Sequence, residues 1–311
     1  MIKRFLDYIA IEKRYSERTV KEYGDDLRMW CEFLGWEQEE FDPNQLDEND
    51  VKGWMIHMMD NGVSARSVKR RLSAVKSLYR FLLATGVVKV NITSKVMMPK
   101  TDKPLPVFFK ESEMAAFKSR NVMPAYDEGM DKEEWLELMR DYLVVELLYQ
   151  TGMRRAELAG LKDSDVDLRA RQVKVFGKRK KERIVPIGDG LVKEIEGDLA
   201  VKREILSEQK GFGTFLVRKK KKGTWVSLGA EGIYNIVRAR MGDVSTLKKH
   251  SPHVLRHTFA TTMLNNGADI RSIQALLGHS SLAATQVYTH ASFEQMKKAY
   301  DEAHPRGRGK S

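Results

Sequence analysis

Apolar residues recur every three or four positions through the N-terminal part of the chain, which is the spacing of amphipathic helices. Ser16, Asp50 and Ser64 precede such runs and can accept a hydrogen bond from the first free backbone amides, so we expect them to begin helices. Gly62 and Gly86 follow two of the runs and are typical helix ends. The pattern predicts four helices, over residues 2–10, 16–34, 50–62 and 64–86.

The helical pattern stops beyond residue 90. Pro99, Pro104 and Pro106 lie in a stretch without periodic apolar positions, which is typical of a linker. An extended, exposed linker would allow the flanking domains to close around a rod such as duplex DNA. The expected division is a helical domain of residues 1–92, a linker of residues 93–106 and a larger domain of residues 107–311.

In the larger domain, helical spacing is interrupted between Asp165 and Ile187, where apolar residues alternate in short runs. Such alternation predicts three antiparallel strands, and a second, basic hairpin is expected around Lys219–Lys222. Four helices are expected over Lys132–Gln150, Arg155–Leu161, Leu191–Ser207 and 230–241, and three more are expected to begin at Ser112, Ser251 and Asp269. A last helix is expected over Phe293–Ala303, preceded by a capping box of Ser292 and Gln295. The predicted fold class is mainly α with a small antiparallel β-sheet, in two domains.

The charge balance changes this picture by suggesting a partner. The 311 residues include 54 Lys and Arg against 43 Asp and Glu, a net charge of +11, which favours a polyanion such as nucleic acid. The sequence contains no apolar run long enough to predict a membrane anchor, and the N-terminus lacks the apolar segment of a signal peptide. The single cysteine, Cys31, excludes an intrachain disulfide and fits a reducing cytoplasm.

One predicted helix carries an unusual excess of basic residues. Between Ala65 and Arg80 there are six basic residues and no acidic one, whereas a merely solvated face usually mixes both signs. We therefore expect this face to contact phosphates, through Arg66, Lys69, Arg70, Lys76 and Arg80.

The densest group of chemically versatile residues lies near the C-terminal end. His253, Arg256 and His257 follow the helix start at Ser251-Pro252, and Tyr288 follows within about one subdomain. Two histidines four residues apart suggest zinc, but the metalloprotease pattern needs Glu where this chain has Val254. We expect no metal and no cofactor.

Arginine, lysine, histidine and tyrosine together suit attack on a phosphodiester. Arginine forks match the two non-bridging oxygens and stabilise the charge that develops on them. Tyrosine is a poor nucleophile at neutral pH unless cations and a neighbouring base favour its phenolate. A lysine can protonate the leaving 5′ oxygen, so the product would be a 3′-phosphotyrosine ester that permits rejoining without ATP.

Five sequence motifs, in order, resemble those of the tyrosine recombinase (phage-integrase-type) family. Thr151–Leu158 is similar to its first arginine box, and Gly177-Lys178 with Lys181–Arg183 is similar to its hairpin lysine motif. The other three are His253–His257, Leu277–His279 and Tyr288–His290. The resemblance covers nearly the whole chain and is strongest to the Xer recombinases, with an ending at 299–306 more similar to XerC than to XerD. It implies a four-helix, SAM-like core-binding domain and an α+β catalytic domain.

The resemblance also assigns roles. Arg154 and Arg256 would clamp the scissile phosphate, Lys178 would protonate the leaving oxygen, and Tyr288 would attack. His253 would be an acid/base or hydrogen-bond donor, and His279 would support the phosphate and the nucleophile, whereas His257 would have a structural role. Arg179, the insertion-like residues 121–132 and the basic run 219–222 depart from the family pattern.

The partners that the resemblance implies are double-stranded DNA, a tetramer on two DNA sites, a XerD-like partner recombinase and a cell-division DNA translocase as regulator. Phe293, Met296 and Tyr300 would either pack on a neighbouring subunit or on their own domain. The expected function is site-specific recombination in chromosome dimer resolution. The alternatives are a mobile-element integrase, a type IB topoisomerase-like enzyme and a catalytically inactive DNA-binding regulator.

Overall fold

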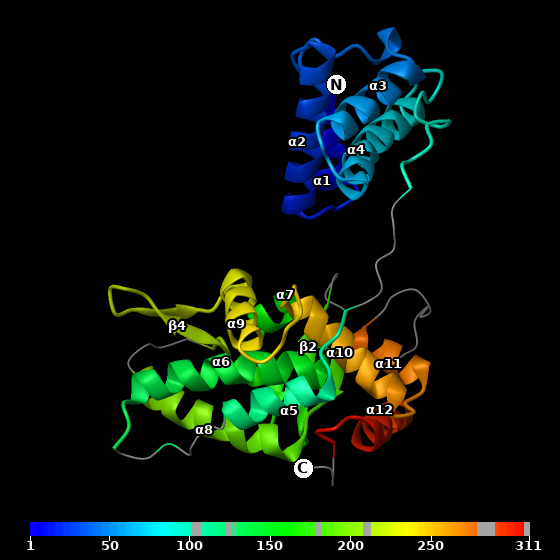
Figure 1. The fold of residues 1–311 in the computed structure, drawn as a ribbon. Helices are drawn as coiled ribbons and strands as arrows, with labels where there is room; N and C mark the ends of the chain where they lie inside the picture. Colours follow the sequence, from blue (N-terminus) through cyan, green and yellow to red (C-terminus); the bar gives the residue numbers. More distant parts are fainter. Residues whose placement is uncertain are drawn as a thin grey trace. The chain divides into compact units, whose positions relative to one another are not determined.

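The computed structural model describes the whole chain except residues 101–106, 122–125, 127–128, 178–181, 208–212, 279–289 and 308–311, together with the side chains of residues 290–293. The chain divides into two compact units, Met1–Pro104 and Leu105–Ser311 (Figure 1). Among the described residues, no helix combines the length and the apolar character needed to cross a bilayer.

The first unit is a small helical domain. Its helices are α1 (Ile2–Ile11), α2 (Glu17–Leu34), α3 (Glu48–Asp60) and α4 (Ala65–Ala84), with a 3₁₀ turn at Pro43–Gln45. Ser16 and Ser64 cap α2 and α4 as predicted, each accepting from the backbone amide three residues on. Their apolar stripes meet in one core around Trp30, whose ring lies 6.0 Å from that of Tyr79.

The predicted start of the third helix was wrong. The helix begins at Glu48, and Asp47 is its N-cap, accepting from the amides of Asn49 and Asp50. The Asp50 carboxylate in turn accepts from the Asp47 amide at 2.7 Å. Either acid could cap a helix. Only a start at Glu48 allows both carboxylates, those of Asp47 and Asp50, to accept hydrogen bonds from backbone amides.

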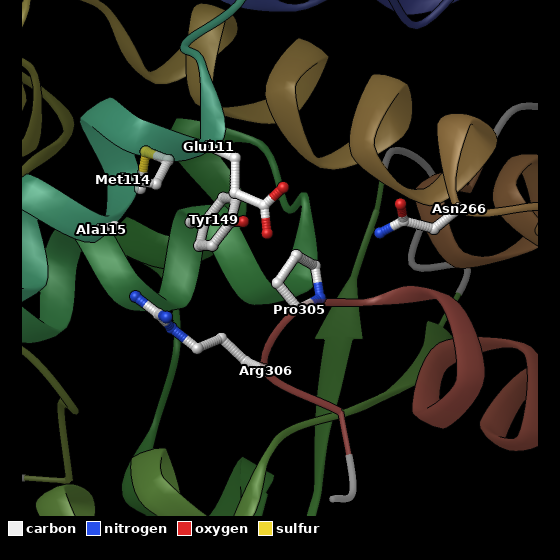
Figure 2. A pocket seen from close by; sticks show the side chains of 7 residues that line it. All are labelled: Glu111, Met114, Ala115, Tyr149, Asn266, Pro305 and Arg306. Carbon is white, nitrogen blue, oxygen red and sulfur yellow. The ribbon is translucent and has the colours of Figure 1, made fainter. Parts of the chain in front are cut away.

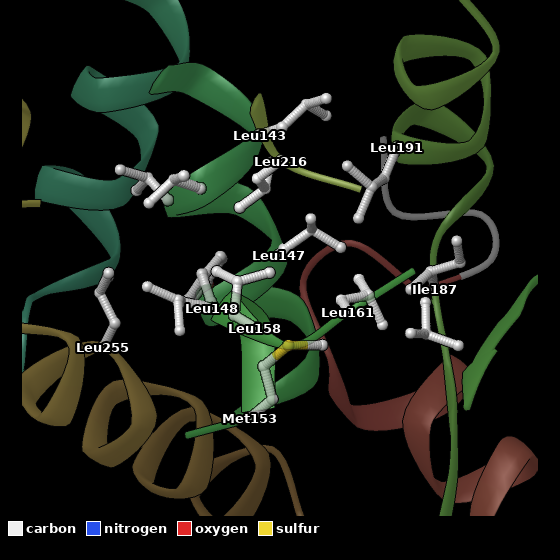
Figure 3. Close-up of a cluster of buried hydrophobic side chains, with 14 of the residues drawn as sticks. Leu143, Leu147, Leu148, Met153, Leu158, Leu161, Ile187, Leu191, Leu216 and Leu255 are labelled. Atoms are coloured by element: carbon white, nitrogen blue, oxygen red, sulfur yellow. The ribbon is translucent and has the colours of Figure 1, made fainter. Parts of the chain in front are cut away.

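The second unit is built around one long, deeply buried helix, α6 (Lys132–Thr151), which packs against α8, α9 and α10. Figure 3 shows Leu143, Leu147 and Leu148 of α6 among leucines from the surrounding elements. The other helices of this unit are α5 (Glu111–Arg120), α7 (Arg155–Ala159), α8 (Asp189–Ile205), α9 (Ala230–Gly242), α10 (Pro252–Asn265), α11 (Ile270–Leu277) and α12 (His290–Ala303), with a 3₁₀ turn at Asp163–Asp165.

Both predicted sheets are present. The first has the order β1 (Val166–Asp167), β2 (Gln172–Phe176) and β3 (Glu182–Pro186), all antiparallel, and the second is the hairpin of β4 (Val217–Lys219) and β5 (Trp225–Ser227). Val173 pairs with Val185, and both are buried, as the alternating pattern requires. The mainly helical, two-domain fold class is thereby confirmed.

Of three predicted helix starts in this unit, two were wrong and one was confirmed. Helix α5 begins at Glu111, before Ser112, because the Glu113 carboxylate accepts the Lys110 amide at 2.7 Å. Ser251 is the N-cap of α10 and Pro252 its first helical residue, as predicted, although the Ser251 hydroxyl makes no cap hydrogen bond. Helix α12 begins at His290, so Ser292 lies inside it; Ala291, a strong helix former, favours the earlier start.

Candidate active site

Three of the six predicted catalytic residues lie in the described part of the chain, namely Arg154, His253 and Arg256. The others, Lys178, His279 and Tyr288, lie outside the described residues. The geometry of the site is therefore built from the two arginines, the histidine and the groups that hold them.

Arg256 connects three segments that are far apart in the sequence. It is buried on α10, and its two terminal nitrogens donate to the carbonyl of Gly152 at 2.6 Å and that of Leu277 at 2.7 Å. Burial, together with the nearby charges of Arg154 and Arg183 and against the effect of Glu157, lowers the pKa of Arg256 to about 10. The guanidinium therefore remains charged at neutral pH and rigidly placed.

Arg154 lies two residues beyond the Gly152 carbonyl that Arg256 holds, at the N-cap position of α7. The Glu157 carboxylate accepts from the Arg154 backbone amide at 2.7 Å and from its guanidinium at 2.9 Å. The Arg154 side chain is 46% exposed, whereas that of Glu157 is 5% exposed. Glu157 thus orients a guanidinium that still faces solvent.

Glu157 and Arg183 lie within two of the family-like motifs, but the sequence interpretation gave neither residue a role in the site. The Arg183 guanidinium binds both carboxylate oxygens of Glu157, at 3.1 and 2.8 Å. Burial alone would raise the pKa of Glu157, but hydrogen bonds and charges from Arg183 and Arg154 bring it below its usual value. An acid at the third position of a helix was a visible signal for Glu157. Arg183 stands at the end of the hairpin lysine motif, but the motif does not show which groups it contacts.

His253 and His257 form a hydrogen-bonded pair, with 3.0 Å between their Nε2 atoms. Burial lowers the pKa of His253, and the proximity of His257, Arg256 and Lys249 lowers it further. A neutral imidazole can accept a proton or donate a hydrogen bond, which fits either role suggested for His253. Among the described residues, no three histidine, cysteine or acidic side chains form a metal-binding group.

A pocket in the second unit lies away from these residues. It has a volume of about 270 Å³ and lies between α5, the end of α6 and the C-terminal segment, lined in part by Glu111, Tyr149 and Arg306 (Figure 2). The three described catalytic candidates, Arg154, His253 and Arg256, do not line it. A substrate as large as a DNA backbone is bound on a surface, so the arginines need no enclosed cavity.

Gly152 provides a steric test of the site. Its φ is +58°, and an added Cβ would lie 2.6 Å from a Phe259 ring carbon and 2.7 Å from a methyl carbon of Leu277. We expect Gly152→Ala to lower the free energy of unfolding by about 2–4 kcal/mol and to reduce DNA cleavage, because the carbonyl that Arg256 binds must move. Urea unfolding and a cleavage assay measure the two effects.

The matched control is Gly267→Ala. Gly267 also has positive φ, at +87°, but nothing lies within 4 Å of its added Cβ. The cost there should be about 1 kcal/mol, from the backbone alone, with cleavage unchanged. Equal effects of the two substitutions would contradict the steric argument.

The basic face of α4 is partly neutralised. Arg70 forms a bidentate ion pair, at 2.6 and 2.8 Å, with Asp26 of α2, and the Lys76 ammonium donates to the Val96 carbonyl at 3.2 Å. Arg66, Lys69 and Arg80 carry exposed side chains. These three are therefore the residues of the predicted DNA-binding set best placed to contact phosphates.

Comparison with known proteins agrees with this architecture. Residues 130–295 match the model described as "Phage integrase family", and residues 2–86 match "Phage integrase, N-terminal SAM-like domain". The tyrosine recombinase XerC of Chlorobaculum parvum is 36% identical, covering 98% of this chain and 94% of that protein. The XerC of Staphylococcus aureus strain NCTC 8325 is also 36% identical, covering 98% and 96%.

Two solved structures share the fold. The integrase of transposon Tn1549, in complex with transposon right end DNA, has a TM-score of 0.65 at 18% identity, covering 96% of this chain and 97% of that chain. A lambda integrase tetramer bound to a Holliday junction has a TM-score of 0.61 at 18% identity, covering 93% and 79%. With both domains matched and relatives alike over nearly their full length, the chain belongs to the phage integrase family and is a DNA-binding, site-specific tyrosine recombinase.

Proposed function

We propose that this recombinase cleaves DNA through the six residues Arg154, Lys178, His253, Arg256, His279 and Tyr288. The observation that carries the proposal is the position of Arg256, which holds the Gly152 turn before Arg154 and the helix end before His279. One buried cation thus organises segments that each lead to another member of the set. This is the arrangement needed to preorganise positive charge around one phosphate.

In the proposed reaction, the Tyr288 oxygen attacks the scissile phosphorus, and the bond from phosphorus to the 5′ oxygen breaks. Arg154 and Arg256 bind the non-bridging oxygens and stabilise their added charge. Lys178 donates a proton to the 5′ oxygen, while the phenol proton passes to a neighbouring base such as His253. The 5′ hydroxyl of another strand then attacks the phosphotyrosine, which restores the phosphodiester and frees the tyrosine.

Trapping and strand exchange test this function. A nicked substrate that loses its short 5′ fragment after cleavage should leave the protein covalently bound to DNA, and two duplexes should exchange strands. A type IB topoisomerase would be trapped without exchanging duplexes, and an inactive regulator would do neither. We expect both activities in EDTA, because the proposed charges come from side chains; cleavage that requires an added divalent ion would contradict the mechanism.

We further propose that the enzyme acts in the cytoplasm as a tetramer on two DNA sites, beside a XerD-like partner, in chromosome dimer resolution under a DNA translocase. The similarity to XerC proteins over nearly the full chain supports the assignment to the XerC-like recombinases. The lone Cys31 is free and buried, and burial raises its pKa to about 11. A free, protonated thiol of this kind is compatible with a reducing compartment. Exchange between a cognate pair of sites with and without a XerD protein tests the partner.

The C-terminal helix is proposed to link subunits in that tetramer. In the single chain, Met296 and Tyr300 of α12 are buried in their own domain, and the Tyr300 hydroxyl lies 3.3 Å from the Gln150 side-chain oxygen. Such an apolar stripe needs a partner surface, from its own domain or from a neighbour. Sedimentation on DNA with and without residues 292–311 decides: loss of the tetramer supports the linking role, and an unchanged tetramer opposes it.

The exposed basic residues of α4 give a prediction about affinity. Replacing Arg66, Lys69 and Arg80 together with glutamine should weaken DNA binding and reduce the slope of log K against log salt by about 2–3, because each lost phosphate contact removes about 0.9. Titrations at several salt concentrations measure the slope. The effect should be similar across DNA sequences, since phosphate contacts carry no base information.

The control replaces Arg18, Arg28 and Lys52 with glutamine. This triple change removes the same charge from the same domain, but these residues form exposed ion pairs with Glu22, Glu32 and Glu48. We expect the salt slope to change by less than about 1. Equal slopes for the two triple variants would mean that net charge, and not the α4 face, sets DNA affinity.

A further inference from the structure

Arg183 is a buried cation at the end of the hairpin lysine motif, where the resemblance assigns it no role. It lies on β3 with only 4% of its side chain exposed. Its Nε donates to the Leu276 carbonyl at 2.6 Å, and its two terminal nitrogens donate to the two oxygens of Glu157 at 3.1 and 2.8 Å. A charge this deep must be compensated, and here the compensation comes from two segments of the candidate active site.

Glu157 is shared between two arginines. While its two oxygens bind Arg183, they also accept from the backbone amide and the guanidinium of Arg154. One negative charge therefore serves two positive ones, which leaves net positive charge beside Arg256. Without Arg183, the same buried carboxylate would have Arg154 as its arginine partner and would compete with a phosphate for it.

Arg183 also fixes the end of α11. It binds the Leu276 carbonyl, while Arg256 binds the next one, that of Leu277. Gly278 follows with φ of +65°, and an added Cβ there would lie 3.2 Å from a terminal nitrogen of Arg183. Two buried guanidinium groups thus hold consecutive carbonyls at the point where the helix ends.

We propose that Arg183 is a positioning residue for strand cleavage, which shares Glu157 so that Arg154 stays available to the scissile phosphate. It also holds the end of α11 together with Arg256. Arg183 touches no reacting atom in this account and acts through Glu157 and the helix end. The inference rests on the proposed role of Arg154 as a phosphate ligand.

The decisive comparison is between Arg183→Met and the double variant Arg183→Met/Glu157→Gln. In the single variant, the uncompensated carboxylate should draw Arg154 away, so we expect covalent trapping on the nicked substrate to slow by at least about 100-fold. The DNA dissociation constant should stay within about threefold, because phosphates along the rest of the site supply most of the affinity. Neutralising Glu157 in the double variant should raise the trapping rate at least about tenfold above that of the single variant.

Trapping is compared at a permissive temperature at which every variant is folded, because neutralising Glu157 also removes an uncompensated buried charge and can restore stability. A rescue of the trapping rate under that condition reports on the positioning of Arg154. Lys202→Met is the matched control: Lys202 is a cation with 3% exposure that pairs with Asp163 in the same domain. It should lower the melting temperature comparably to Arg183→Met, with trapping at a permissive temperature unchanged. If Arg183→Met does not fold, Arg183→Lys replaces it in the test. Lysine keeps the charge but lacks the planar guanidinium that binds both Glu157 oxygens, so trapping should slow about tenfold.

Trapping at the wild-type rate in the folded Arg183→Met variant, or in Arg183→Lys, would overturn the inference. A folded double variant no faster than the single one would overturn it as well. Failure of the unmodified protein to be trapped would instead contradict the proposed function, so the two ideas fail separately.

Discussion

The variant Tyr288→Phe is expected to form no covalent complex with DNA. Phenylalanine retains the ring but lacks the oxygen that would bond to phosphorus, so trapping on a nicked substrate should fall by at least about 10⁴-fold. DNA affinity should remain within about threefold, because a single hydroxyl contributes little beside many phosphate contacts. Denaturing electrophoresis of the reaction measures the complex, and a gel shift measures binding.

Tyr126→Phe is the control for this substitution. Tyr126 is a partly buried tyrosine of the same unit whose ring contacts Trp135, outside the proposed set. Its trapping should equal that of the unmodified protein. Covalent complex persisting in Tyr288→Phe would show that another residue is the nucleophile, and the proposed mechanism would then be wrong at its first step.

The second large effect is expected from Arg256→Lys, although the substitution keeps a positive charge. A lysine cannot reproduce the planar fork that donates to the Gly152 and Leu277 carbonyls. A buried carbonyl left without its donor costs about 1–3 kcal/mol of stability, and the mispositioned cation should slow cleavage by about 10²–10³-fold. Urea unfolding and single-turnover trapping measure these losses.

Arg240→Lys provides the comparison. Arg240 of α9 is also partly buried and donates two hydrogen bonds to Asp141, so the substitution makes the same chemical change in the same domain. We expect a similar or smaller loss of stability and unchanged single-turnover trapping. If both lysine variants slowed trapping alike, the effect of Arg256→Lys would come from general destabilisation.

The expectation for Arg256→Lys has a plain physical basis: the proposed phosphate site depends on the rigidity of its cations. Arg256 obtains that rigidity from two backbone carbonyls, and Arg154 obtains it from Glu157. Burial of Arg256 also means that no large reorganisation is needed when a phosphate arrives. Arg256→Lys removes the first of these supports and leaves the second in place.

Several features of the fold follow from residues that are close in sequence. The caps at Ser16, Ser64 and Asp269 and the antiparallel pairing of β2 with β3 were all predicted from patterns a few residues long. They are predictable because a cap or a turn is decided by atoms within about four positions along the chain. The missed starts of α3 and α5 have the same origin, since neighbouring acids offered two local solutions.

The sequence by itself determined the family motifs, the order of the elements and the residue types available for chemistry. Only the tertiary structure decided that Asp26 neutralises Arg70, that Arg183 shares Glu157 with Arg154, and that Arg256 holds two distant carbonyls. Each of these contacts joins segments whose meeting depends on how whole helices pack. Charge can be counted along a chain, but which charges remain available to a ligand depends on the partners that folding brings to them.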